Sequence, residues 1–126
     1  MKSFMVAMII FVLIILGSGY YSYALTKSID NIEVKLSEVE ASLLNHNWDE
    51  CNEKTEALMQ DWEKTQKWLK AIVNHKEIDV IIQALYEMKG YIRVKNKEEA
   101  LVTVGVLRMF FRHIPANESL AIINIL

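Results

Sequence analysis

Apolar residues recur every three or four positions over most of the chain. This spacing places them on one face of an α-helix, and no stretch of useful length shows the period-two alternation of a β-strand. After residue 26 the pattern divides into four segments, whose apolar-face positions are Ile29, Ile32, Leu36, Val39 and Leu43; Trp48, Cys51, Thr55, Leu58, Trp62, Thr65, Leu69 and Ile72; Ile78, Ile81, Leu85, Met88 and Ile92; and Ala100, Val104, Leu107 and Phe111. The sequence therefore predicts an all-α fold.

Short polar segments separate the four predicted helices: Asn45-His46-Asn47, Asn74-His75-Lys76 and Lys95-Asn96-Lys97. Asn47 and Asn96 stand where an asparagine side chain caps the helix that follows. Because turns this short bring consecutive helices together as antiparallel neighbours, we predict an antiparallel four-helix bundle.

The end of the chain is predicted to form a further element. Pro115 is expected to end the fourth helix, since proline lacks the backbone N–H that a helix needs. The residues beyond it are too apolar to remain in water: Leu120, Ile122, Ile123, Ile125 and Leu126. We expect residues 119–126 to form a short C-terminal helix that folds back onto a second helix of about 28 residues.

The chain also matches itself at an offset of 49 residues. The matching positions include Ile29 and Ile78, Leu36 and Leu85, Leu43 and Ile92, Asn47 and Asn96, Leu58 and Leu107, and Trp62 and Phe111. A heptad pattern alone produces matches at 49, but the repeated caps and the small residues Cys51 and Ala100 go beyond it. We predict two related helical hairpins, in a closed bundle or in the manner of tetratricopeptide repeats. Repeat arrays usually need three or more units, which favours the bundle.

The N-terminal residues have a different pattern. Residues 4–16 include no polar side chain, and residues 4–25 include no charge. A helix of that length crosses a hydrocarbon core of roughly 30 Å. Tyr20, Tyr21 and Tyr23 then lie where an aromatic belt meets the headgroups, and Lys27 follows. We predict a transmembrane anchor over residues 1–25 and a helical domain over residues 26–126.

A cleaved signal peptide is the alternative, with Lys2 at its start and Ser22-Tyr23-Ala24 as the cleavage site. The long tyrosine-rich stretch before this site argues against cleavage. Lys2 favours a cytoplasmic N-terminus, against the competing charges of Lys27 and Lys35. We therefore expect a single-pass protein of the cell membrane whose C-terminal domain lies outside.

Charge is distributed unevenly along the predicted domain. Residues 30–63 hold ten acids and two lysines, whereas residues 64–112 hold ten basic residues and five acids. In one interpretation the two hairpins complement each other. In the other, a basic patch faces anionic lipid or wall polymer; its residues are Lys89, Arg93, Lys95, Lys97, Arg108 and Arg112. The slight net charge of −2 and the expected location disfavour nucleic acid as a partner.

The motifs of enzymes and of zinc sites do not occur: no glycine-rich phosphate loop, no His-Glu-x-x-His, no Gly-x-Ser-x-Gly and no pair of cysteines. We therefore expect no enzymatic activity and no cofactor. The single Cys51 is expected to be a small buried side chain, with an intermolecular crosslink as the alternative.

One set of side chains nevertheless has the composition of a metal site. In an up-down-up-down bundle His113 comes near His75, Glu77 and Asp79, and two imidazoles with two carboxylates suit a divalent metal. The alternative is that these side chains stabilise helix ends, the histidines near C-termini and the acids at an N-terminus.

An ordered series of residues resembles a known family: Asn47-Trp48-x-x-Cys51, Trp62, Trp68, His75-x-Glu77-Ile78-Asp79, Tyr91-Ile92, His113-Ile114-Pro115 and Asn124-Ile125-Leu126. It is a small bacterial family, found mainly in Gram-positive spore-formers and described as a domain of unknown function. The resemblance implies the same architecture and a bacterial membrane location. Family members usually carry alanine in place of Cys51, which favours a small core residue there. The resemblance implies no activity or ligand.

Together these patterns predict a non-enzymatic helical module for interaction or envelope assembly, held at the membrane. Its expected partners are membrane lipid and another membrane or envelope protein. The alternative is a metal- or ligand-sensing accessory subunit that uses the four residues above and acts through a membrane partner. An enzyme of unrecognised type is the least favoured function.

Overall fold

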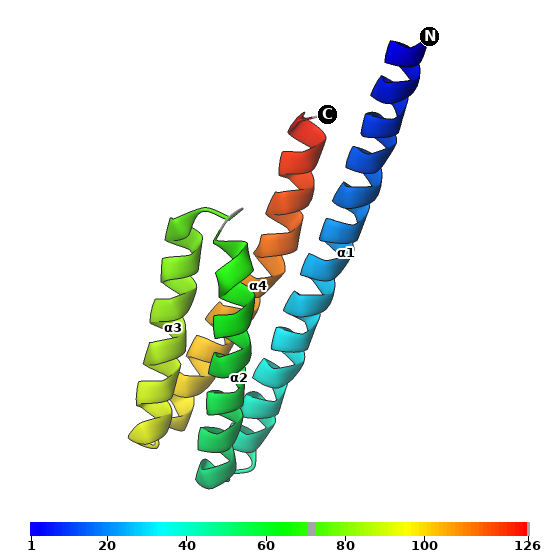
Figure 1. The fold of residues 1–126 in the computed structure, drawn as a ribbon. Coiled ribbons are helices and arrows are strands. Elements are labelled where there is room, and N and C mark those ends of the chain that lie inside the picture. Colours follow the sequence, from blue (N-terminus) through cyan, green and yellow to red (C-terminus); the bar gives the residue numbers. More distant parts are fainter. Residues whose placement is uncertain (71–72, 126) are drawn as a thin grey trace.

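A computed structural model describes residues 1–70 and 73–125, without the side chains of Trp68 and of residues 115–125. It contains four helices: α1 (Lys2–Leu44), α2 (Trp48–Leu69), α3 (His75–Arg93) and α4 (Lys97–Ile125) (Figure 1). The described residues include no β-strand. The predicted all-α fold and the four-helix bundle are confirmed.

The helices run up and down, so that chain neighbours are antiparallel (Figure 1). α1 packs against α2 and α4, and α4 also packs against α3, whereas α2 and α3 contact each other least. Residues three or four positions apart form the core because they share one face of each helix. The buried apolar residues are Leu25, Ile29, Ile32, Leu36, Val39, Leu43, Cys51, Leu58, Trp62, Leu69, Val73, Ile78, Ile81, Ala84, Leu85, Met88, Ile92, Ala100, Val104, Leu107, Phe111 and Ile114.

The two halves of α1 have different surroundings. Its N-terminal half projects beyond α2 and α3, and its first turns project beyond α4 as well (Figure 1); the apolar side chains of residues 4–16 are exposed. Burial begins at Leu25, from which point the same helix contributes to the core. By length and composition the N-terminal half is apolar enough to cross a membrane. No proline interrupts α1, so the apolar segment and the bundle share one continuous helix.

The predicted repeat is confirmed by the two turns. His46 and Lys95, 49 residues apart, both adopt positive φ angles, of 57° and 58°. The N–H of the next residue, Asn47 or Asn96, bonds the carbonyl five positions earlier, which is the Schellman arrangement of a helix end. Each asparagine then accepts a hydrogen bond at its side chain, from the N–H of Glu50 or of Glu99. The predicted caps are therefore correct, and each hairpin turns within three residues.

The prediction for the C-terminal segment was wrong. α4 continues through Pro115 to Ile125 as one helix, with no separate element. Proline removes one backbone donor and crowds the carbonyl four residues earlier, a defect that a long helix can absorb by bending. The second helix is also shorter than expected, with 22 residues ending at Leu69. The long helix that extends past the α2–α3 turn is therefore α4 and not α2.

Candidate functional site

The end of the bundle next to the exposed half of α1 carries the predicted membrane-interface residues. Tyr20 and Tyr23 are 75% and 65% exposed, and Lys27 is exposed as well. The spacing of these three residues places them on one face of α1. Tyr21, in contrast, packs against the core. The turn between α2 and α3 and the end of α4 lie at this same end (Figure 1).

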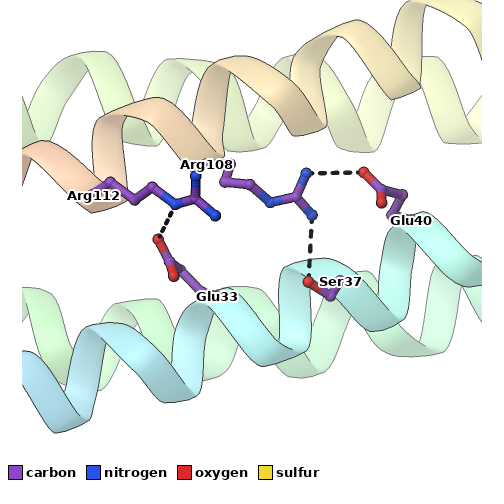
Figure 2. A network of polar contacts seen from close by, with 5 residues as sticks. All are labelled: Glu33, Ser37, Glu40, Arg108 and Arg112. Atoms are coloured by element: carbon purple, nitrogen blue, oxygen red, sulfur yellow. Dashed lines mark hydrogen bonds and ion pairs between the residues drawn. The ribbon is translucent and has the colours of Figure 1, made fainter.

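The seam between α1 and α4 is bridged by charged side chains (Figure 2), and Glu33, Arg108 and Arg112 also line a groove of about 540 Å³ there. Arg108 donates from Nη1 to Glu40 Oε2 over 3.0 Å and from Nη2 to Ser37 Oγ over 3.3 Å. One turn along, Arg112 Nε lies 3.4 Å from Glu33 Oε1. Arg108 and Arg112 are four residues apart, so they project from the same side of α4 towards α1. The Arg108 contacts are partly shielded from solvent, with its side chain 25% exposed, whereas the Arg112 side chain is 68% exposed.

The seam between α2 and α3 is held by less extensive helix contacts than the α1–α4 seam. It holds a groove of about 390 Å³ lined by Glu56, Met59, Gln60, Trp62, Glu63, Gln66, Ile82, Leu85, Tyr86 and Lys89. One ion pair spans it, from Lys89 Nζ to Glu56 Oε1 over 2.7 Å. Trp62 packs at a tilt against Phe111 with ring centroids 5.5 Å apart, and its buried indole N–H has no acceptor among the described residues.

The six residues of the predicted basic patch fall into two groups. Lys89, Arg108 and Arg112 pair with Glu56, Glu40 and Glu33 respectively, all acids of the first hairpin. These pairs support the interpretation that the two hairpins complement each other. The other three, Arg93, Lys95 and Lys97, lie around the α3–α4 turn, at the end of the bundle away from the apolar half of α1 (Figure 1).

The predicted metal cluster is not assembled. Glu77 and His113 line a mainly apolar groove of about 390 Å³ between α3 and α4, whereas His75 and Asp79 do not line it. The reason is helical geometry: His75 and Asp79 are four residues apart on one face of α3, and Glu77 points to the opposite side. Within residues 1–70 and 73–125, no three His, Cys, Asp or Glu side chains are grouped closely enough to hold a metal ion.

Cys51 lies fully buried at the first turn of α2. Burial raises the pKa of its thiol, and the neighbouring Glu50 carboxylate adds to the shift. A thiol in this state is a weak nucleophile. The position is therefore that of a small core side chain, equivalent to Ala100 in the second hairpin.

The α2–α3 groove was not predicted from the sequence. A signal for it exists in Tyr86, a large aromatic residue that falls outside the apolar positions Ile81, Leu85 and Met88 of its helix. Tyr86 is 61% exposed. Exposed aromatic residues of this kind are typical of interaction surfaces.

No curated protein and no solved structure matches this chain. A family model does match, over residues 20–125, with the description Domain of unknown function (DUF4363). The match begins at the tyrosines of α1 and ends with α4, so it includes the complete bundle. Since it covers most of the chain, this protein belongs to that family of unknown function.

Proposed function

We propose that this protein is a single-pass membrane protein that holds a helical bundle outside the cell membrane as a module for interaction or envelope assembly. The observation that carries the proposal is the division of α1. One continuous helix exposes apolar side chains over residues 4–16 and buries them in the bundle from Leu25 onwards. Exposed apolar surface of this extent is stable in lipid and not in water.

The continuity of α1 also favours an assembly role. No flexible linker separates the apolar half from the bundle, so the orientation of the bundle follows that of the membrane segment. The bundle surface offers grooves along its helix seams. Grooves between helices are where amphipathic partners bind. Lys2 before the apolar run supports a cytoplasmic N-terminus.

Membrane fractionation with an alkaline wash tests the anchor. Wild-type protein is expected to stay in the washed membranes and to be digested by protease added outside intact spheroplasts. Ile10→Arg/Leu13→Arg is expected to shift the chain to the soluble fraction, because charges in a hydrocarbon core are costly. Val102→Arg, at an exposed apolar position of α4, is the matched control and should remain bound. Wild-type chain in the wash, or a mature protein that begins after Ala24, would overturn the anchor.

Ligand sensing is a second candidate function, supported by the placement of Glu77 and His113 in one groove near the apolar half of α1. Calorimetry of the full chain in detergent with Zn²⁺ and Ni²⁺ tests it. Binding that His113→Ala abolishes and that His46→Ala, at an exposed turn, leaves intact would support a sensor. Absence of binding at millimolar metal would remove metal sensing.

A further inference from the structure

The two hairpins provide two equivalent seams, α1–α4 and α2–α3, which can be compared position by position. The clamp residues of the first seam are Glu33, Ser37, Glu40, Arg108 and Arg112. A shift of 49 residues forward takes the three α1 positions to Ile82, Tyr86 and Lys89 of α3. The same shift backward takes the two arginine positions of α4 to Met59 and Glu63 of α2. All five line the α2–α3 groove. The groove is thus the counterpart of the α1–α4 seam, and all five clamp residues are replaced in it.

The replacements explain why α2 and α3 are joined less extensively than α1 and α4. Tyr86 stands where Ser37 binds Arg108, and Met59 stands where Arg108 itself lies in the other seam. Without a pair of arginines that reach across, α2 and α3 are joined by the Lys89–Glu56 ion pair and contact each other least of all neighbouring helices. The result is an exposed tyrosine above partly buried Met59 and Ile82. An aromatic-centred patch with a charged rim is the composition of a protein interface.

Along each side of the groove, the charge of the exposed side chains changes sign once. The Lys89–Glu56 pair sets the relative height of the antiparallel helices, so that Glu53 lies level with Arg93, and Lys67 lies level with Asp79. Away from the apolar half of α1, α2 is therefore acidic where α3 is basic. Towards that half, α2 is basic where α3 is acidic. Within the part of the chain that the structure describes, these four exposed side chains form no ion pair.

We propose that the α2–α3 seam is the binding surface for a second copy of this chain. A two-fold axis parallel to the helices places α2 of one copy against α3 of the other at the same height. Two levels of the rim then meet the opposite charge: Glu53 meets Arg93, and Lys67 meets Asp79. Tyr86 of both copies lies near the axis and covers the apolar floor. The direction of the axis rests on the proposed function, because two copies anchored in one membrane are held parallel.

Cysteine crosslinking in membranes tests the dimer. Tyr86→Cys is placed in a full-length Cys51→Ala chain, and the matched control is Ser37→Cys, the equivalent exposed position of the α1–α4 seam. With a mild oxidant or a short bismaleimide, Tyr86→Cys is expected to yield several-fold more covalent dimer than Ser37→Cys. Equal crosslinking at both positions, no dimer at either, or a Tyr86→Cys adduct with a different protein overturns the proposal.

Charge reversal adds a second, independent readout. Lys89→Glu/Arg93→Glu in the Tyr86→Cys chain is expected to reduce the dimer several-fold, and Glu53→Lys/Glu56→Lys in the same chain is expected to restore it. Failure of the second pair to restore the dimer, with folding verified by tryptophan fluorescence, counts against the proposed contacts. The fraction in which the dimer appears separates the two hypotheses. Dimer in the soluble fraction overturns the anchor alone, and monomer in the membrane overturns the dimer alone.

Discussion

In the first hairpin, α1–α2, the buried positions include Leu36 and Leu58, and in the second, α3–α4, they include Leu85 and Leu107 at the same offset of 49. The two turns repeat each other down to their left-handed residues, His46 and Lys95. The surfaces do not repeat. The buried residues and the turn residues determine the shape of each hairpin. Two hairpins of the same shape therefore need similar residues at these positions.

The difference between the surfaces shows how the hairpins pair. Ion pairs connect them, and in each one formed by the described side chains the acid comes from the first hairpin and the base from the second: Glu33–Arg112, Glu40–Arg108 and Glu56–Lys89. Two first hairpins docked in the same way would bring acids against each other. The charges therefore select the pairing of unlike hairpins, which two similar apolar faces alone would not distinguish.

Truncation of equivalent core residues is expected to have the largest effect on the comparison. Leu36→Ala and Leu85→Ala should each lower the free energy of unfolding by about 2–5 kcal/mol, because both leave cavities in a closely packed core. Chemical unfolding of the full chain in detergent, followed by tryptophan fluorescence, measures it. A neutral result at one position only would show that the hairpins are not equivalent.

Reversal of a charge between the hairpins is expected to have the next largest effect. Arg108→Glu should destabilise the bundle by about 1–2 kcal/mol, since it removes two charge-assisted hydrogen bonds and places two carboxylates together. Glu40→Arg/Arg108→Glu should recover most of the loss. Lys54→Glu is the control within one hairpin, where the 3.5 Å pair with Glu38 is more exposed and a smaller loss is expected. Equal losses of unfolding free energy in Arg108→Glu and Lys54→Glu would contradict a special role of the ion pairs between the hairpins.

Glycine at the two left-handed positions should stabilise both hairpins by a similar amount. His46→Gly and Lys95→Gly are each expected to raise the free energy of unfolding by about 0.5–1 kcal/mol, because glycine adopts positive φ without steric cost. Asn45→Gly, at a residue with negative φ, should not stabilise. Thermal unfolding of the three variants measures the effect, and a gain at one turn only would break the equivalence.

Cys51→Ala, which makes the first hairpin resemble the second at Ala100, is expected to have the smallest effect, about 1 kcal/mol or less at neutral pH. The pKa of the buried thiol is raised, so the folded state holds its proton more tightly than the unfolded state. The stability that this contributes is present below the ordinary thiol pKa and is lost as pH rises above it. Between about pH 7 and 10, the free energy of unfolding should therefore decrease more steeply for wild type than for Cys51→Ala, as measured by unfolding curves at each pH.

The helices and turns were predictable because their causes are local. The 3.6-residue period, the capping asparagines 47 and 96, and the acids behind them all act within a few residues of the chain. The repeat was visible for the same reason. The prediction failed at Pro115, whose missing N–H did not end α4, because a long helix can absorb such a defect by bending.

The four residues of the predicted metal site are not grouped together, for a different reason. Proximity of His113 to the start of α3 was inferred from topology, and Glu77 and His113 do share a groove. Which side of α3 each residue faces depends on where the helix begins and on its rotation in the bundle. With α3 starting at His75, the side chains of His75 and Asp79 face away from Glu77.

By itself, the sequence determined the helices, the hairpin repeat and an apolar segment long enough to cross a bilayer, since each depends on the spacing and type of nearby residues. Only the tertiary structure decided that this segment continues without a break into the first core helix, that Arg108 and Arg112 clamp α1, and that α2 and α3 contact each other least. These features depend on which faces of distant helices meet. Packing of the whole core determines which helix faces contact each other, and no short stretch of chain specifies it.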